Sequence, residues 1–418
     1  MKMNAKRTYF LVSTSCLLLT VVSLLLSRGE AWSKLLVENG YLYIGDFLMH
    51  LQFVDNPQNV YFAYEGCCFP PLAYVFFLFV NRILPSNGAP DMNFYRGIPI
   101  AVIMIFAGMM LCMMILAWMI REYNGDRKLQ NIGLLVLILF SAPFLCDAIE
   151  RGNTVLHTLV FLVLALYLKD SENKAARESA LVLIAVAASF KIYPAVFGLL
   201  YVKEKRYKEA MRLAIYGILL FFVPFLFFGG FAGFLQFLHN LTAVQSKITV
   251  NICTITGLVE FLYAKICMGS VAPVTVDMIP AGVHLTGEII SVVYLVLVCV
   301  LVFWEKKQWK VMLYLSSLMI IFTNSSFSYT TIYMLIPFLF FLKDEGEKQS
   351  REGVINAVLF GLIFTICNLP GAWFEGFFGE SIGRLIRYPA IYVMLLYGVI
   401  GSLTGIYRAK KKGEKNVC

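Results

Sequence analysis

The sequence predicts an all-α protein that crosses a membrane many times. Of its 418 residues, 59% are hydrophobic and 15% are charged, and the mean hydropathy is +0.75. Apolar runs of spanning length alternate with short charged loops, which is typical of a polytopic helical bundle. This composition excludes an ordinary soluble protein and a disordered one. We expect residues 1–418 to form a single membrane domain with about 10 to 13 spans.

The first predicted helix covers residues 8–26. A basic stretch precedes it, and no small-residue cleavage pattern follows it, so we interpret it as a retained helix rather than a signal peptide. Basic residues at its start place the N-terminus in the cytoplasm. The segment that follows, residues 27–71, is therefore expected on the non-cytoplasmic side.

Later basic loops extend this orientation map, because short loops rich in Lys and Arg stay in the cytoplasm. They lie at 121–128, 169–177, 203–212, 305–310, 343–351 and 408–415. Between them, apolar segments are expected to cross and return in pairs: 131–149 with 154–168, 310–324 with 329–342, and 354–370 with 384–407. Both termini are then cytoplasmic. The turns within the pairs, around Arg151, Ser325 and 373–384, face the other side.

Three stretches need separate treatment. Residues 178–202 have a cytoplasmic-looking loop at each end, so they form either one span or a hairpin that turns at Lys191-Ile192-Tyr193-Pro194. The proline after a charged residue favours the hairpin. Residues 70–84 are too short to span easily. Residues 231–283 are less hydrophobic and are expected to form a second non-cytoplasmic or re-entrant segment.

The loop 27–71 contains the most polar part of the first half of the chain. Lipid cannot satisfy its carboxyl, amide and imidazole groups, so this loop is expected to face water or a polar cavity and to be catalytic. Aromatic and apolar residues mixed with charges predict interfacial helices there. Those residues are Trp32, Leu35, Leu36, Tyr41 and Tyr43.

Asp46 is the leading catalytic candidate in this loop. Its carboxylate suits a general base that accepts a proton from a hydroxyl nucleophile. The alternative, given equal weight, is that Asp46 caps an interfacial helix. His50 lies one helical turn further on and could orient Asp46 or share a metal with it. A position at the membrane interface is favoured over both.

Arg151 and Lys191 are candidate anchors for a phosphate group, Arg151 as a bidentate fork and Lys191 as a point charge. Arg151 could instead pair locally with Glu150 or Asp147. Asn153 is equally explained by capping of the next helix. The candidate substrate-binding residues are His50, Tyr64, Glu65, Arg151, Asn153, Lys191 and Tyr193.

Other chemistry finds little support in the sequence. The net charge of +9 lies mostly in loops and tails, so no nucleic-acid partner is inferred. The ten cysteines form no C-x-x-C pair, and a bond between the neighbours Cys67 and Cys68 would be strained. Asn240-Leu241-Thr242 and Asn324-Ser325-Ser326 match the glycosylation sequon, a common chance match.

No cofactor or metal is expected. Nucleotide-binding and zinc motifs are absent from the sequence, and no second acid follows Asp46 in a D-x-D pattern. Asp46, His50, Asp55 and Glu65 are the residues that could in principle assemble a divalent-metal site.

Read in order, several of these groups resemble glycosyltransferase family 87. The residues that carry the resemblance are Gly45-Asp46-Phe47, Val60-Tyr61, Phe69-Pro70-Pro71-Leu72, Leu84-Pro85, Arg151-Gly152-Asn153 and Lys191-Ile192-Tyr193-Pro194. The last two are also similar to motifs of the GPI mannosyltransferase I family. The resemblance covers the first half of the chain by motif and the second half by hydropathy.

The resemblance implies a GT-C fold and an inverting enzyme that takes mannose from a polyprenyl-phosphate-linked donor. It implies that Asp46 is the catalytic base, and that the acceptor is a lipid or glycan on the non-cytoplasmic face of the plasma membrane. Where the family carries a late His, this chain reads Ser325-Ser326-Phe327-Ser328-Tyr329, which leaves the donor sugar open.

Two other functions remain as alternatives: a transporter or flippase of lipid-linked glycans, and a polymerase of envelope polysaccharide. A transporter would more often show internal repeats and broken helices in both halves. The polar candidates here gather in the first half, which favours the enzyme.

Overall fold

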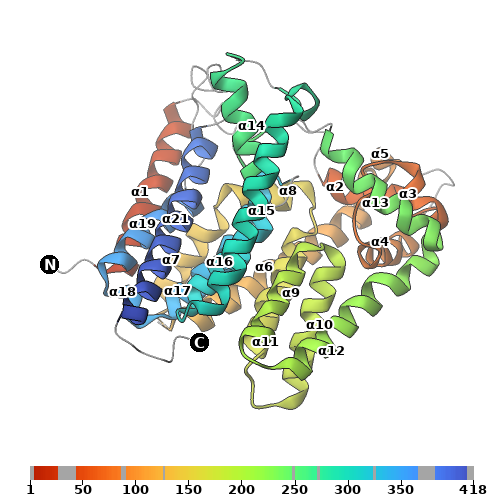
Figure 1. Cartoon of the computed structure of the whole chain (residues 1–418). Helices are drawn as coiled ribbons and strands as arrows, with labels where there is room; N and C mark the ends of the chain where they lie inside the picture. The colour runs from red at the N-terminus through yellow and green to blue at the C-terminus, as the bar shows by residue number, and fades with distance from the viewer. Residues whose placement is uncertain are drawn as a thin grey trace. The chain divides into compact units, whose positions relative to one another are not determined.

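A computed structural model of the chain describes residues 4–26, 44–85, 91–125, 128–246, 250–270, 274–322, 326–365 and 382–411 (Figure 1). Throughout these ranges the regular elements are α-helices and short 3-10 helices, with no strand, which confirms the all-α prediction. The chain folds into two compact units. The predicted interfacial helices at 27–43 and most of the turn at 373–384 lie outside the described residues.

The first unit contains Met1–Glu38, Ile120–Asp147 and Thr249–Cys418. Its helix α16 is buried along its whole length and packs against α15, α17 and α21, while α1 runs beside α19. Its helices are α1 (Ala5–Leu26), α7 (Leu129–Phe140), α14 (Ile255–Ile266), η6 (Val276–Met278), α15 (Ala281–Trp304), α16 (Gln308–Ile320), η7 (Ser328–Met334), α17 (Leu335–Lys343), α18 (Glu345–Lys348), α19 (Arg351–Thr365) and α21 (Ile382–Lys411).

The second unit contains Asn39–Met119 and Ala148–Ile248. Its helices are α2 (Gly45–Phe53), η3 (Pro57–Asn59), α3 (Val60–Ala63), α4 (Pro71–Ile83), α5 (Met92–Arg96), α9 (Val155–Leu168), α10 (Lys174–Phe190), η4 (Tyr193–Gly198), α11 (Leu199–Lys203), α12 (Tyr207–Phe222), η5 (Val223–Phe227) and α13 (Gly230–Ser246). Helices α6 (Pro99–Asn124) and α8 (Pro143–Arg151) run from one unit into the other.

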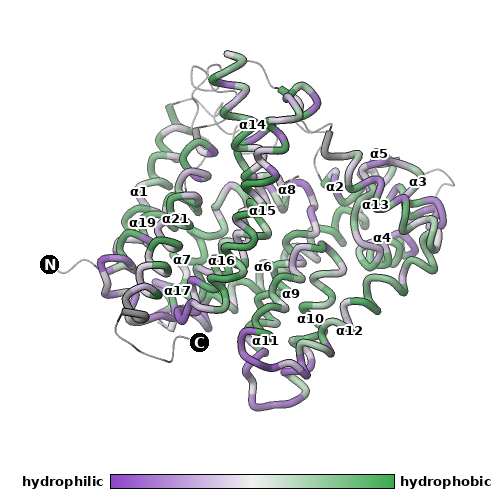
Figure 2. The backbone as a smooth tube through the Cα atoms, in the orientation of Figure 1, coloured by the Kyte–Doolittle hydropathy of each residue, from purple (hydrophilic) through white to green (hydrophobic). Residues whose placement is uncertain are grey.

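The chain is a multi-pass membrane protein, as predicted. Five described helices are long and apolar enough to cross a membrane: Ala5–Leu26, Pro99–Asn124, Tyr207–Phe227, Ala281–Trp304 and Gly383–Tyr407. Figure 2 shows these helices as mostly apolar, with hydrophilic residues gathered in the loops near α11.

Within the part of the chain that the structure describes, five or six helices are long and apolar enough to span, against the ten to thirteen spans expected for the chain. A sixth span is present only if α7 and α8 count as one, because Pro143 begins a new helix there and the pair bends by 62°. Two stretches expected as spans form shorter apolar helices, Val155–Leu168 and Ser328–Lys343, and the stretch judged too short to span easily forms Pro71–Ile83. These helices are about as long as their apolar runs, but both are shorter than the roughly 20 residues that a spanning helix needs.

Residues 178–202 form a hairpin, which settles the choice between one span and two short helices. Helix α10 ends at Phe190, and Lys191 is extended, with φ −145° and ψ 128°. The chain returns through η4 and α11, so that Glu204 Oε1 lies 2.5 Å from Lys169 Nζ. A second ion pair joins Arg206 Nη1 to Asp170 Oδ1 at 3.0 Å. These pairs hold the two basic loops together at one end of the hairpin.

Candidate active site

Asp46 is the second residue of the nine-residue helix α2. The N-cap position is taken by Ile44, whose φ of 47° is left-handed, and no side chain caps the helix. The carboxylate of Asp46 therefore does not cap α2, which rules out the structural alternative considered for it. Its side chain is 22% exposed, so the carboxylate can meet a substrate.

The Arg151-Gly152-Asn153 turn packs onto the first residues of α2. It closes the end of α8 with two bonds typical of a Schellman motif, Gly152 N–H to Ile149 O at 3.0 Å and Asn153 N–H to Ala148 O at 3.0 Å. Such a turn needs a left-handed residue, and Gly152 has φ +69°. The Ile44 N–H donates to Glu150 O at 2.6 Å, which joins the turn to α2.

Gly152 is needed for a second reason. A Cβ atom at this position would lie 2.9 Å from Phe47 Cβ and 3.3 Å from Ile44 Cα. Such contacts are far closer than the usual separation of carbon atoms, about 3.5–4.0 Å. Only glycine lets the turn come this close to the helix that carries Asp46.

Both carboxylate oxygens of Asp46 have partners from this turn. Asn153 Nδ2 donates to Asp46 Oδ2 at 2.7 Å, and Arg151 Nη1 lies 3.8 Å from Asp46 Oδ1. Asn153 Oδ1 in turn accepts from Val155 N–H at 3.1 Å, which fixes the orientation of the amide. Asn153 therefore fixes the chain just before α9, whose N-cap is Thr154, and orients Asp46. Its role in substrate binding stays a prediction.

Lys191 lies at the turn of the α10 hairpin and is buried. Its Nζ stands 3.6 Å from the centre of the Phe69 ring. Burial lowers the pKa of Lys191 to about 8, while the nearby charge of Asp46 acts in the opposite direction. Among the described residues, no carboxylate forms an ion pair with its ammonium group. A buried cation of this kind is suited to an incoming anion.

His50 is buried within the protein, and its predicted position at the membrane interface stays a prediction. Its side chain is 2% exposed and is enclosed by Phe69 and Phe77, with ring centroids at 4.2 and 5.2 Å. Its Nδ1 lies 3.3 Å from Tyr74 Oη. Burial, together with the charge of Lys191, lowers the pKa of His50 to about 3. The imidazole is therefore neutral and forms part of the aromatic packing beneath Asp46.

The remaining candidates have different positions. Tyr64 is 52% exposed and stacks on Phe53, at the end of α2 far from Asp46, with ring centroids 5.7 Å apart. Glu65 is partly buried in the same loop, and Tyr193 is partly buried at the start of η4, two residues after Lys191. The structure thus brings together Asp46, Arg151, Asn153, Lys191 and, beneath them, His50.

Two structural residues were missed by the sequence analysis. Phe69 contacts both Lys191 and His50 through its ring. Asn240 is fully buried and its Nδ2 donates to Tyr61 O at 2.8 Å and Cys67 O at 3.1 Å, which ties the loop before Phe69 to α13. The available signal was an amide side chain at position 240 in a largely apolar helix, α13. Because both bonds use Nδ2, the sequon at Asn240 is not accessible for glycosylation in this fold.

Cys67 and Cys68 are free thiols, in agreement with the prediction. Across the described ranges, no group of three or more His, Cys, Asp or Glu side chains is arranged to hold a metal ion.

Comparison with known proteins gives one family. The model of glycosyltransferase family 87 matches residues 68–328, which is more than half of the chain. Arg151, Asn153 and Lys191 fall inside the match, whereas Asp46 and His50 precede it. A search of curated proteins gives no match.

Proposed function

Because the chain belongs to glycosyltransferase family 87, we propose that it transfers a hexosyl group, with mannose the expected sugar, from a polyprenyl-phosphate-linked donor to a hydroxyl group of a lipid or glycan acceptor. Family membership supports glycosyl transfer over the transporter alternative. The similarity to GPI mannosyltransferase I remains a prediction.

The observation that carries this proposal is the arrangement around Asp46. A partly exposed carboxylate is oriented by Asn153 at 2.7 Å and flanked by the guanidinium of Arg151. Lys191 supplies a buried ammonium group close enough to be influenced by the charge of Asp46. A base for a hydroxyl nucleophile and a cation for a phosphate leaving group are the two parts that this transfer requires.

In the proposed step, the acceptor oxygen attacks the anomeric carbon of the donor sugar from the face opposite the phosphate. The new carbon–oxygen bond forms as the bond from the anomeric carbon to the phosphate oxygen breaks. The electron pair of the broken bond leaves with polyprenyl phosphate, and the hydroxyl proton passes to Asp46. The configuration at the anomeric carbon is inverted.

Lys191 is assigned to the phosphate in this scheme. Its ammonium group has three donors and rests on the face of Phe69, so it can stabilise the charge that develops on the leaving oxygen. Arg151 was expected to bind the phosphate as well. Its position against Asp46 supports a different role, which is to orient the base.

The hairpin supports a site on the non-cytoplasmic face of the plasma membrane. Lys169, Glu204 and Arg206 mark the basic end of the α9–α10 pair. Asn153 begins α9 and Lys191 follows α10, so both lie at the opposite end. Basic loops stay in the cytoplasm, and this rule supports cytoplasmic termini and a catalytic site on the far side.

The proposal is tested by transfer from polyprenyl-phosphate-mannose in membranes that contain the wild type or Asp46→Asn. Loss of the base is expected to lower kcat by about 10²–10⁴-fold. Glu172→Gln, which changes an exposed carboxylate in the α9–α10 loop, at the end of this helix pair opposite to Asn153 and Lys191, is the control and should keep the wild-type rate.

Equal transfer by wild type and Asp46→Asn would refute Asp46 as the base. If the wild type transfers no mannose but accepts another polyprenyl-phosphate sugar, the donor assignment is wrong and the reaction type stands.

A further inference from the structure

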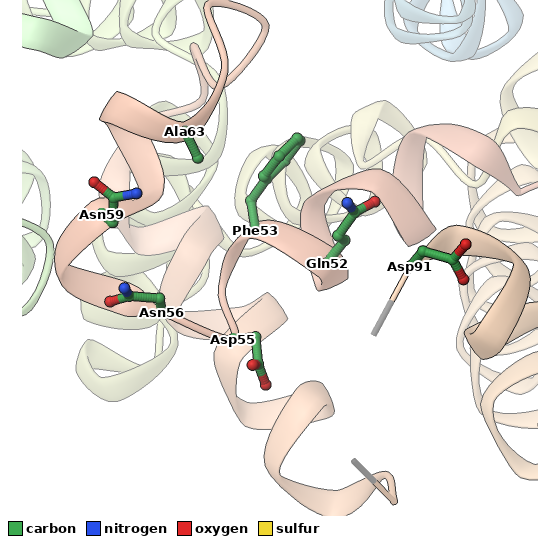
Figure 3. A pocket seen from close by; sticks show the side chains of 7 residues that line it. All are labelled: Gln52, Phe53, Asp55, Asn56, Asn59, Ala63 and Asp91. Atoms are coloured by element: carbon green, nitrogen blue, oxygen red, sulfur yellow. The ribbon is translucent and has the colours of Figure 1, made fainter. Parts of the chain in front are cut away.

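An open cavity of about 310 Å³, lined mainly by residues with polar side chains, lies at the end of α2 far from Asp46. Its volume falls near the lower limit for ligand pockets, about 300–1,000 Å³. Figure 3 shows Asn56 and Asn59 on one side of Phe53, with Gln52 and Asp91 on the other. The lining residues are Gln52, Phe53, Asp55, Asn56, Asn59, Ala63 and Asp91.

The lining combines amide and carboxylate groups with an aromatic ring. Asn56 and Asn59 are exposed, and each amide offers both donors and an acceptor. Asp91 uses Oδ1 to cap α5 by accepting from Phe94 N–H at 2.7 Å. Groups of both kinds around a small volume suit a ligand that carries many hydroxyl groups.

The aromatic surface of the cavity consists of Phe53 and the neighbouring Tyr64, and contacts with Phe53 and Gly66 fix the position of the Tyr64 ring. The Tyr64 ring stacks on Phe53 with an angle of 16° between the planes. A Cβ atom at Gly66 would lie 2.2 Å from Tyr64 Cε1, so only glycine at position 66 leaves room for the Tyr64 ring where it lies. Although 52% exposed, Tyr64 is thus a preset apolar surface, of the kind against which the C–H face of a sugar ring can pack.

Helix α2 links this cavity to Asp46. Phe53 follows Asp46 by seven residues, which is close to two helical turns, so the two side chains share one face about 10 Å apart along the axis. Met49 lies between them on that face and is partly exposed, whereas Phe47, Leu48 and Leu51 point into the core. A substrate can therefore lie along the exposed side of α2.

We propose that the cavity lined by Gln52, Phe53 and Asn59, with Tyr64 at its edge, binds a sugar unit of a glycan acceptor whose terminal hydroxyl reacts at Asp46. This inference rests on the proposed function, and it narrows the acceptor from lipid or glycan to one that carries at least two sugar units. A separation of about 10 Å is comparable to the length of a disaccharide.

A hard cation such as Ca²⁺ is the competing occupant, because Asp55, Asp91 and the amide oxygens are ligands that it accepts. Two observations favour the sugar. The aromatic pair of Phe53 and Tyr64 offers nothing to a hard cation, and Oδ1 of Asp91 already accepts a backbone hydrogen bond.

The test is photo-crosslinking of the full-length protein in membranes with a mannobioside that carries a diazirine. Labelled peptides are mapped by mass spectrometry. We expect label on residues 52–64, and excess free mannobiose should compete with it. Asn59→Ala and Tyr64→Ala should each lower the labelling by about 3- to 10-fold, because each removes one polar or apolar contact.

Matched controls are Asn93→Ala and Tyr207→Ala, which change an exposed amide and an exposed ring outside the cavity and should label as the wild type does. Transfer gives a second readout. The kcat/KM ratio for octyl mannobioside over octyl mannoside should fall in the cavity variants and not in the controls.

The outcomes separate this inference from the proposed function. If residues 52–64 of the wild type are labelled but the wild type transfers no sugar, the cavity is a saccharide site and the transferase mechanism is refuted. Transfer with no cavity label, or with label unchanged by both cavity variants, would overturn the subsite. Displacement of the label by Ca²⁺, and not by mannobiose, would assign the cavity to a cation and also overturn it.

Discussion

Gly152→Ala gives the sharpest test of how the fold positions the base. Gly152 has φ +69°, and an alanine in this conformation costs about 1–2 kcal/mol. The added Cβ would also lie 2.9 Å from Phe47 Cβ. Reaching an ordinary carbon–carbon separation requires the turn and α2 to move apart by about 0.6–1 Å.

That shift acts directly on Asp46. The bond from Asn153 Nδ2 to Asp46 Oδ2 is 2.7 Å, and an added 0.6–1 Å takes it beyond the usual limit of about 3.2 Å. A misplacement of about 1 Å can cost 10²-fold in rate. We therefore expect kcat to fall by about 10- to 100-fold, measured as the initial rate of sugar transfer in membranes.

Gly230→Ala is the matched control. Gly230 has φ +59°, and no described atom lies within 4 Å of the position that an added Cβ would take. The Gly230→Ala variant should have a similar conformational cost, seen as a lower thermal unfolding midpoint, but should keep the wild-type kcat. The reasoning fails if Gly152→Ala transfers sugar at the wild-type rate, or if Gly230→Ala loses as much activity.

The other contacts of this unit support three further predictions. Burial lowers the pKa of Lys191 to about 8, so the ammonium group loses its charge as the pH rises through 8, and KM for the anionic donor should rise by up to tenfold per pH unit. Lys191→Arg should flatten this pH dependence of KM. If the pH profile of Lys191→Arg equals that of the wild type, Lys191 does not bind the donor. Asn240→Ala breaks two buried bonds to backbone carbonyls and a third from Gln236, and should lower the free energy of unfolding by about 1–3 kcal/mol. A denaturation midpoint equal to that of His239→Ala, which changes an exposed side chain on the same helix, would argue against it. Cysteines introduced at Glu172 and Lys205 should react with an impermeant maleimide from the same side of the membrane; labelling from opposite sides would contradict the hairpin.

Much of the fold could be predicted from hydropathy and charge. The first helix, expected at 8–26, spans Ala5–Leu26, and Pro71 begins α4. The basic loops at 169–177 and 203–212 do lie together, as ion pairs show. These features depend on local composition and on loop charge, which the sequence displays directly.

The partners of the candidate site residues could not be read in this way. The nearby acids Glu150 and Asp147 were the partners that the sequence indicated for Arg151. No pattern pointed to Asp46, 105 positions earlier in the chain, whose Oδ1 lies 3.8 Å from Arg151 Nη1. His50 stands one helical turn from Asp46, which suggested a shared exposed face. Its burial depends on Phe69 and Phe77, which belong to later segments. Tertiary contacts of this kind leave no periodic pattern in the sequence.

The convergence of the Arg151-Gly152-Asn153 and Lys191 groups is, by contrast, a consequence of helix length. Helix α9 has 14 residues and α10 has 17, so they rise about 21 and 26 Å. They pack as consecutive helices joined by a short loop, and two antiparallel helices of similar length return the chain to the level at which it started. Asn153 before α9 and Lys191 after α10 must then lie at the same end. The Gly152 turn fixes α2, which carries Asp46, at this same end of the helix pair. The hairpin at Lys191 is therefore enough to bring a cation toward the Asp46 carboxylate.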